Sequence, residues 1–115
     1  MKKEKKEEID VTQLQLSEQA LQNLLLQKQL FQYELVETNT ALEELKKTKQ
    51  EDVFKIVGSL MIKSERAELE KELERKKELL ELRLKAIEKQ EQELKNKLLK
   101  QRDLLLEQMK AKKQQ

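Results

Sequence analysis

The stretch Val-Phe-Lys-Ile-Val-Gly-Ser-Leu-Met-Ile-Lys, residues 53–63, decides the fold of this chain. It contains the only glycine of the sequence, Gly58, and it separates two long segments with helical periodicity. Glycine followed by serine suits a two-residue type II′ turn, which needs a positive φ at its first position. The competing interpretation, one continuous helix, is opposed because mid-helix glycine costs about 1 kcal/mol and β-branched residues prefer strands. Residues 53–63 therefore predict a central β-hairpin.

Both faces of this hairpin are mainly apolar. The turn predicts three cross-strand pairs, namely Val57 with Leu60, Ile56 with Met61, and Lys55 with Ile62. A hairpin with one solvated face alternates apolar and polar residues, and this one does not. Two narrow helices cannot cover both faces and both open edges, so we expect hairpins of several chains to join in a shared sheet or barrel. The alternative is a hairpin folded back on its own helices. The residues assigned to assembly are Val53, Phe54, Ile56, Val57, Gly58, Leu60, Met61 and Ile62.

Apolar residues recur every seven positions on both sides of the hairpin. In the first segment the two seam positions hold Leu14, Leu21, Lys28, Leu35 and Leu42, and Ser17, Leu24, Phe31, Thr38 and Leu45. In the second they hold Leu73, Leu80, Ile87 and Leu94, and Leu84, Leu98 and Leu105, with Lys77 and Glu91 as polar interruptions. Such heptads predict a coiled coil. Because the hairpin returns the chain, the two helices are expected to run antiparallel.

We expect one mainly α domain with four parts. Residues 1–10 are nearly all charged and are predicted to form a disordered tail. Residues 11–49 and 65–113 are the two coiled-coil helices, and residues 50–64 contain the hairpin. Ser64 is the predicted N-cap of the second helix. This arrangement would bring both ends of the chain to one distal tip.

The composition excludes several classes of protein. With 42% charged and 3% aromatic residues, the chain cannot bury a compact core, and it has the composition of long helices. It contains no histidine and no cysteine, so we expect no enzyme site, no metal and no cofactor. A single glycine cannot build a phosphate-binding loop. Interleaved charges with a net charge of +2 argue against a nucleic-acid partner. No apolar run reaches the length of a membrane span, so a soluble cytoplasmic protein is expected.

The hairpin between two heptad-bearing arms resembles a prefoldin β-type subunit of the archaeal kind. The second arm adds Lys-Glu-Leu-Glu at residues 71–74 and Leu-Leu-Glu-Leu-Arg-Leu at residues 79–84. The resemblance covers about residues 11–109, and its most specific part is residues 53–63. A single hairpin matches the β class, because the α class carries two. The charged start, residues 1–10, departs from the usual β-type beginning.

The resemblance implies an ATP-independent co-chaperone. Prefoldin is a hexamer of two α-type and four β-type subunits, whose hairpins form a double β-barrel platform. Six coiled coils extend from the platform, and their tips hold non-native proteins and pass them to a group II chaperonin. The implied partners are therefore α-type subunits, other copies of this chain, non-native clients and a group II chaperonin.

The ends of the helices contain more leucine than one seam can bury. Three consecutive leucines occur at residues 24–26 and again at 104–106, and consecutive helical residues point about 100° apart. The surplus is expected to be exposed and to bind apolar segments of clients, for which the adaptable side chain of methionine is well suited. The candidate client-binding residues are Leu14, Leu16, Leu99, Leu104, Leu106 and Met109. The alternative is ordinary seam packing at these positions. A structural tether without chaperone activity is the alternative for the whole chain.

Overall fold

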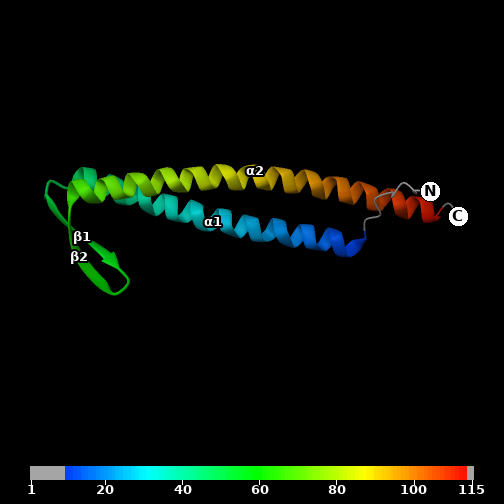
Figure 1. The fold of residues 1–115 in the computed structure, drawn as a ribbon, viewed down its shortest axis with the longest axis horizontal. Helices are drawn as coiled ribbons and strands as arrows, with labels where there is room; N and C mark the ends of the chain where they lie inside the picture. Colours follow the sequence, from blue (N-terminus) through cyan, green and yellow to red (C-terminus); the bar gives the residue numbers. More distant parts are fainter. Residues whose placement is uncertain (1–9, 114–115) are drawn as a thin grey trace, which may run out of the picture. The chain divides into compact units, whose positions relative to one another are not determined.

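The computed structural model describes residues 10–113 of the chain. The elements follow in the order α1 (Val11–Lys47), β1 (Asp52–Val57), β2 (Leu60–Glu65) and α2 (Arg66–Lys113) (Figure 1). The prediction of two long antiparallel helices joined by a central hairpin is confirmed. Of the predicted charged tail, only Asp10 lies within the described residues. Neither described helix is long and apolar enough to cross a membrane.

The chain forms two compact units, which are described separately. The hairpin unit, Gln29–Lys85, contains the hairpin together with the end of α1 and the start of α2. The terminal unit, Met1–Lys28 and Ala86–Gln115, contains the start of α1 and the end of α2, and its described residues are 10–28 and 86–113.

The hairpin is the two-stranded antiparallel sheet that the turn residues predict. Its register pairs Asp52 with Glu65, Val53 with Ser64, Phe54 with Lys63, Lys55 with Ile62, Ile56 with Met61, and Val57 with Leu60. Gly58 has a φ of +62°, and no other described residue has a positive φ, so Ser59 does not. A positive φ at the first turn position alone is the type II′ pattern. The predicted turn and its three pairs are confirmed.

The predicted N-cap at Ser64 is wrong. Ser64 belongs to β2 and pairs with Val53, and α2 begins two residues later at Arg66. The reason is that backbone pairing continues to the base of the hairpin, where the N–H of Arg66 donates to the carbonyl of Glu51 at 2.7 Å. The strand therefore leads directly into the helix and leaves no turn for a serine cap.

Arg66 also joins the two helices of the hairpin unit. Its guanidinium donates to the carbonyl of Thr48, directly after the end of α1. A helix leaves its last carbonyls without intrahelical partners, and a cation near them is favourable. One residue thus begins α2, continues the strand ladder and satisfies the end of α1.

The seam of the hairpin unit buries leucines from both helices. Leu42, Leu45, Leu80 and Leu84 are buried, which confirms the heptad prediction at these positions. Thr38 interrupts the seam and is only 2% exposed, yet its hydroxyl donates to the carbonyl of Glu34 in its own helix at 2.8 Å. Arg83 of α2 lies over the ring of Phe31 at 5.6 Å from the centroid, a cation–π contact.

We predict that Gly58→Ala destabilises the hairpin. A Cβ at this position meets no heavy atom within 4 Å, so the cost is backbone strain rather than a clash. Forcing an L-residue to a positive φ costs about 1–2 kcal/mol. Chemical denaturation of the variant should show a loss of this size, whereas the control Ser59→Ala should lose much less. Equal stability of the wild type and Gly58→Ala would contradict the assignment of the turn.

Candidate functional site

The hairpin presents apolar side chains to solvent on both faces. Six of them are exposed, namely Phe54, Ile56, Val57, Leu60, Met61 and Ile62. On one face Ile56 is 74% exposed, and on the other Leu60 is 64% exposed. A two-stranded sheet also leaves the outer edge of each strand without a backbone partner. An apolar patch of this kind marks an interaction site.

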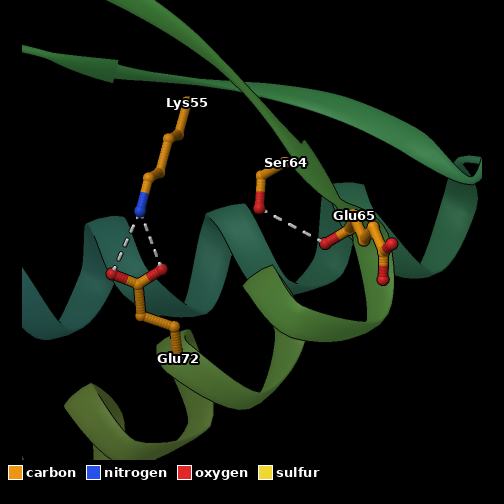
Figure 2. Close-up of polar contacts among 4 residues, drawn as sticks. All are labelled: Lys55, Ser64, Glu65 and Glu72. Atoms are coloured by element: carbon orange, nitrogen blue, oxygen red, sulfur yellow. Dashed lines mark hydrogen bonds and ion pairs between the residues drawn. The ribbon is translucent and has the colours of Figure 1, made fainter.

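Only the base of one hairpin face contacts the helices. Figure 2 shows Lys55 pointing from β1 toward Glu72 of α2, and the Lys55 Nζ lies 3.2 Å from Glu72 Oε2. Lys55, Val53 and Ser64 on this face are half-buried. An exposed ion pair of this type contributes little to stability. The hairpin thus folds back on its own helices only at its base. The apolar residues near its turn remain exposed, so this alternative does not explain them.

The seam of the terminal unit follows the predicted heptads. Its apolar members are Ile87 and Leu98, which are buried, and Leu14, Leu21, Leu24, Leu94 and Leu105, which are half-buried. Two polar residues that interrupt the predicted seam, Lys28 and Glu91, contact each other. The Lys28 Nζ lies 2.8 Å from Glu91 Oε1. In the sequence analysis Lys28 and Glu91 are two separate interruptions of the seam. Their opposite charges, at seam positions of two antiparallel helices, could have indicated the pair.

Glu91 is a buried carboxylate with both oxygens paired. It is 9% exposed, and Lys95, one turn along α2, donates to its second oxygen at 2.8 Å. The hydrogen bonds from Lys28 and Lys95 lower the pKa of Glu91. The hydrogen bond to Glu91, with the nearby charge of Glu88, raises the pKa of Lys28. The pair is therefore ionised at neutral pH, and removal of one partner leaves a buried charge unpaired.

Two further polar residues are buried in this unit. Ser17, an expected interruption, is 7% exposed, and Gln101, which the leucine pattern did not include, is 9% exposed. Gln101 stands one heptad after Leu94, so continuing that repeat would have placed it in the seam. Its Oε1 atom is buried and has no hydrogen-bond partner.

A groove lies where the start of α1 meets the end of α2. It has a volume of about 710 Å³, and it is lined by Asp10, Val11, Leu105, Gln108, Met109, Ala111 and Lys112. Val11, which the sequence analysis missed as a candidate, is more than half exposed. It could have been found as the apolar residue that begins the first helix.

The structure separates the six predicted client-binding residues into two groups. Leu16, Leu99, Leu106 and Met109 are each more than half exposed, as expected, and Met109 lines the groove. Leu14 and Leu104 are half-buried instead. Leu14 occupies a seam position, so its side chain is directed toward the partner helix. The exposed members of the two leucine runs are Leu26 and Leu106.

The hairpin and the exposed leucines together define a class of protein. A helix pair that carries an uncovered apolar hairpin is an assembly subunit, and its solvent-exposed leucines suit a binding protein.

Comparison with known proteins gives the family. Residues 3–112 match the family model of prefoldin subunits. The chain is 45% identical over 87 residues to prefoldin subunit beta of Thermococcus onnurineus, which covers 75% of each chain. It is 40% identical over 85 residues to prefoldin subunit beta of Archaeoglobus fulgidus, which covers 73% of each. The structure is similar to the crystal structure of the prefoldin beta subunit from Thermococcus strain KS-1, with a TM-score of 0.72, 37% identity, and coverage of 88% of this chain and 87% of that one.

The chain belongs to the prefoldin family, as a β-type subunit of the archaeal kind. Prefoldin subunits are non-enzymatic chaperones, so the predicted co-chaperone class is confirmed and the tether alternative is not favoured.

We predict that Glu91→Gln lowers the stability of the terminal unit at neutral pH and flattens its acid dependence. The folded pKa of Glu91 lies below its ordinary value of 4.5, so its contribution is present above that pH and is lost as the pH falls through the folded value. Lys28 has a raised folded pKa, so its contribution is present below 10.5 and is lost at higher pH.

Thermal melts of the wild type and the variant across pH 3–8, a range of about five units around the carboxylate pKa values, measure this difference. The gap between the two melting temperatures should be largest near neutral pH and should close below about pH 4.5. Glu93→Gln, a change on the exposed face of the same helix, is the matched control. A constant gap at all pH values would rule out the ion pair as the cause.

Proposed function

We propose that this chain is one of four β-type subunits in a hexamer with two α-type subunits. The hexamer works in the cytoplasm without ATP, holds non-native proteins at the ends of its helix pairs, and delivers them to a group II chaperonin. This extends the family assignment to particular partners and to a particular site on this chain.

The observation that carries the proposal is the uncovered hairpin. Both of its faces expose apolar side chains, and both strand edges remain open. Burial of apolar surface contributes about 25 cal/mol per Å², so the hairpin gains stability only where other chains cover it. In this proposal, hairpins of α-type subunits and of other copies of this chain cover it by extending the sheet at its edges.

The proposed client site is the tip, by which we mean the end of the terminal unit around the chain-end groove. Four exposed apolar residues, Leu16, Leu99, Leu106 and Met109, lie in this unit, and Val11 adds a fifth. Their side chains are apolar, which suits the apolar segments that non-native proteins expose. Delivery to a chaperonin rests on the family likeness alone.

We predict that replacing Leu16, Leu99, Leu106 and Met109 with serine weakens suppression of client aggregation several-fold. Each change removes an exposed apolar contact, of the order of 1–2 kcal/mol when covered. Light scattering from a denatured client diluted into the assembled complex measures the effect. The matched control changes four exposed apolar residues of the hairpin unit to serine, namely Leu30, Tyr33, Leu79 and Leu82. If the tip variant assembles and still suppresses client aggregation fully, the tip is not the client site.

We predict that Ile56→Lys with Met61→Glu prevents assembly and leaves the helices folded. These residues are a cross-strand pair, so opposite charges are tolerated in the free hairpin. Burial of the two charges between subunits would cost several kcal/mol. Mass measurement by light scattering, after co-expression with an α-type subunit, should give single chains in place of the complex. Lys63→Gln, on the same face, should assemble normally, and assembly of the charged pair would contradict the interface.

A further inference from the structure

We propose that Lys28 and Glu91 determine which helices of this chain pair with each other. They favour the pairing of α1 with α2, and they oppose the pairing of like helices, α1 with α1 or α2 with α2, between two copies of the chain. This choice of partner does not depend on where clients bind. It becomes important wherever copies of the chain fold close together, as the four β-type subunits of the proposed complex would.

The leucines of the seam do not distinguish between these partners. Leucine is the commonest residue at the seam positions of both helices. A heptad stripe of one apolar residue determines which helix faces meet, whereas polar and charged positions select the partner. A second copy of the chain offers two more stripes of the same kind. Selection therefore has to come from the seam positions that are not apolar.

One pair of opposite charges occupies facing seam positions in the terminal unit. The Lys28 Nζ lies 2.8 Å from Glu91 Oε1, and only 23% and 11% of the two side chains are exposed. Lys95 lies 2.8 Å from the second oxygen of Glu91. The two charges are thus held between the helices, where the sign of the facing charge has its largest effect.

Each residue of the pair lies close to the middle of its helix. α1 has 37 residues, and its middle residue is Gln29, next to Lys28. α2 has 48 residues, and its middle falls between Lys89 and Gln90, less than one turn before Glu91. A residue in the middle of a helix meets its own counterpart when two copies of that helix overlap fully. This holds for the parallel and for the antiparallel arrangement.

Full overlap of two like helices therefore brings like charges together. Two copies of α1 would place Lys28 near Lys28, and two copies of α2 would place Glu91 near Glu91. Such charges repel each other, and each lacks the counter-ion from the facing helix that its burial requires. Pairing of α1 with α2 brings opposite charges together instead. The pair thus discriminates between helices whose leucine stripes are alike.

The hairpin connection and the ion pair contribute to this choice in different ways. The connection raises the effective concentration of α2 around α1 of the same chain. Hairpins that join several chains also raise the concentration of the neighbouring helices, including those of the same kind. Proximity alone does not oppose these alternatives. The ion pair does, because it favours unlike helices.

The test replaces the ion pair with leucine, as Lys28→Leu with Glu91→Leu in the full chain. Replacement of a buried ion pair by apolar residues is often neutral or stabilising, so the melting temperature should not fall. The choice of partner should be lost instead. A pair that contributes only to stability predicts the opposite result, a lower melting temperature with no change of partner.

Two introduced cysteines report the choice of partner. The chain has none of its own, so Leu21→Cys with Leu35→Cys supplies the only thiols. These positions are about 21 Å apart along α1, too far to form a disulfide within one chain. When two copies of α1 pair around Lys28, position 21 faces position 21 in the parallel arrangement and position 35 in the antiparallel one. Oxidation after refolding from denaturant then links the two chains, and a non-reducing gel measures the covalent dimer.

Covalent dimers should be rare with the ion pair present and several-fold more abundant in the leucine variant. Glu44→Leu with Lys47→Leu is the matched control, because it removes an exposed ion pair of α1 and adds two leucines outside the seam. It should leave the amount of dimer unchanged. Reversal of all three charges, Lys28→Glu with Glu91→Lys and Lys95→Glu, keeps every attraction and should also leave it unchanged.

Three results would overturn the proposed selection. Equal amounts of dimer with and without the ion pair mean that the pair does not choose the partner. Dimer in the charge-reversed variant at the level of the leucine variant means that charge complementarity is not the cause. Loss of helical circular dichroism in the leucine variant means that the pair is required for stability rather than for selection.

Discussion

Two helices can bury only one stripe of side chains between them, and this limit governs the rest of the structure. In the hairpin unit the stripe is filled by Leu42, Leu45, Leu80 and Leu84, with Thr38 satisfied by its own helix. Every other apolar side chain of the helices has to face solvent or another molecule. The same limit applies to the hairpin, because the helices cover no more than its base. Exposed apolar residues are thus a direct consequence of the architecture.

The many charged residues of the chain offset the exposure of these apolar side chains. The chain is 42% charged, and most charged residues of α1 and α2 are exposed, with acidic and basic residues interleaved. They keep isolated apolar residues hydrated without creating a field of one sign. Exposed apolar residues lie on the hairpin, at the chain ends and along the helices between them.

The sequence predicts the hairpin and the seam because both depend on short-range rules. Gly58 followed by Ser59 determines the turn, and the turn determines the cross-strand pairs. The seven-residue spacing of leucine determines which helix faces meet. The errors arise where a local rule competes with a longer-range one. Ser64 is a good cap residue in isolation, yet backbone pairing continues past it to Glu65.

The exact pairing across the helices could not be predicted from the heptads alone. The contact of Lys28 with Glu91 depends on the offset between α1 and α2, and that offset depends on the segment from Thr48 to Glu65. If α1 is shifted by seven residues along α2, the same helix faces still meet, so the heptads do not select one alignment.

Thr38 and Gln101 show why the position of a polar residue in a seam is not enough to judge its effect. Both are buried interruptions of a leucine repeat. The threonine hydroxyl is a donor on a short side chain, and it reaches the Glu34 carbonyl one turn earlier in its own helix. The glutamine oxygen is an acceptor, and an α-helix interior has no free N–H to offer it. The first interruption is therefore satisfied within its own helix, whereas the second leaves a buried acceptor without a partner in the helix pair.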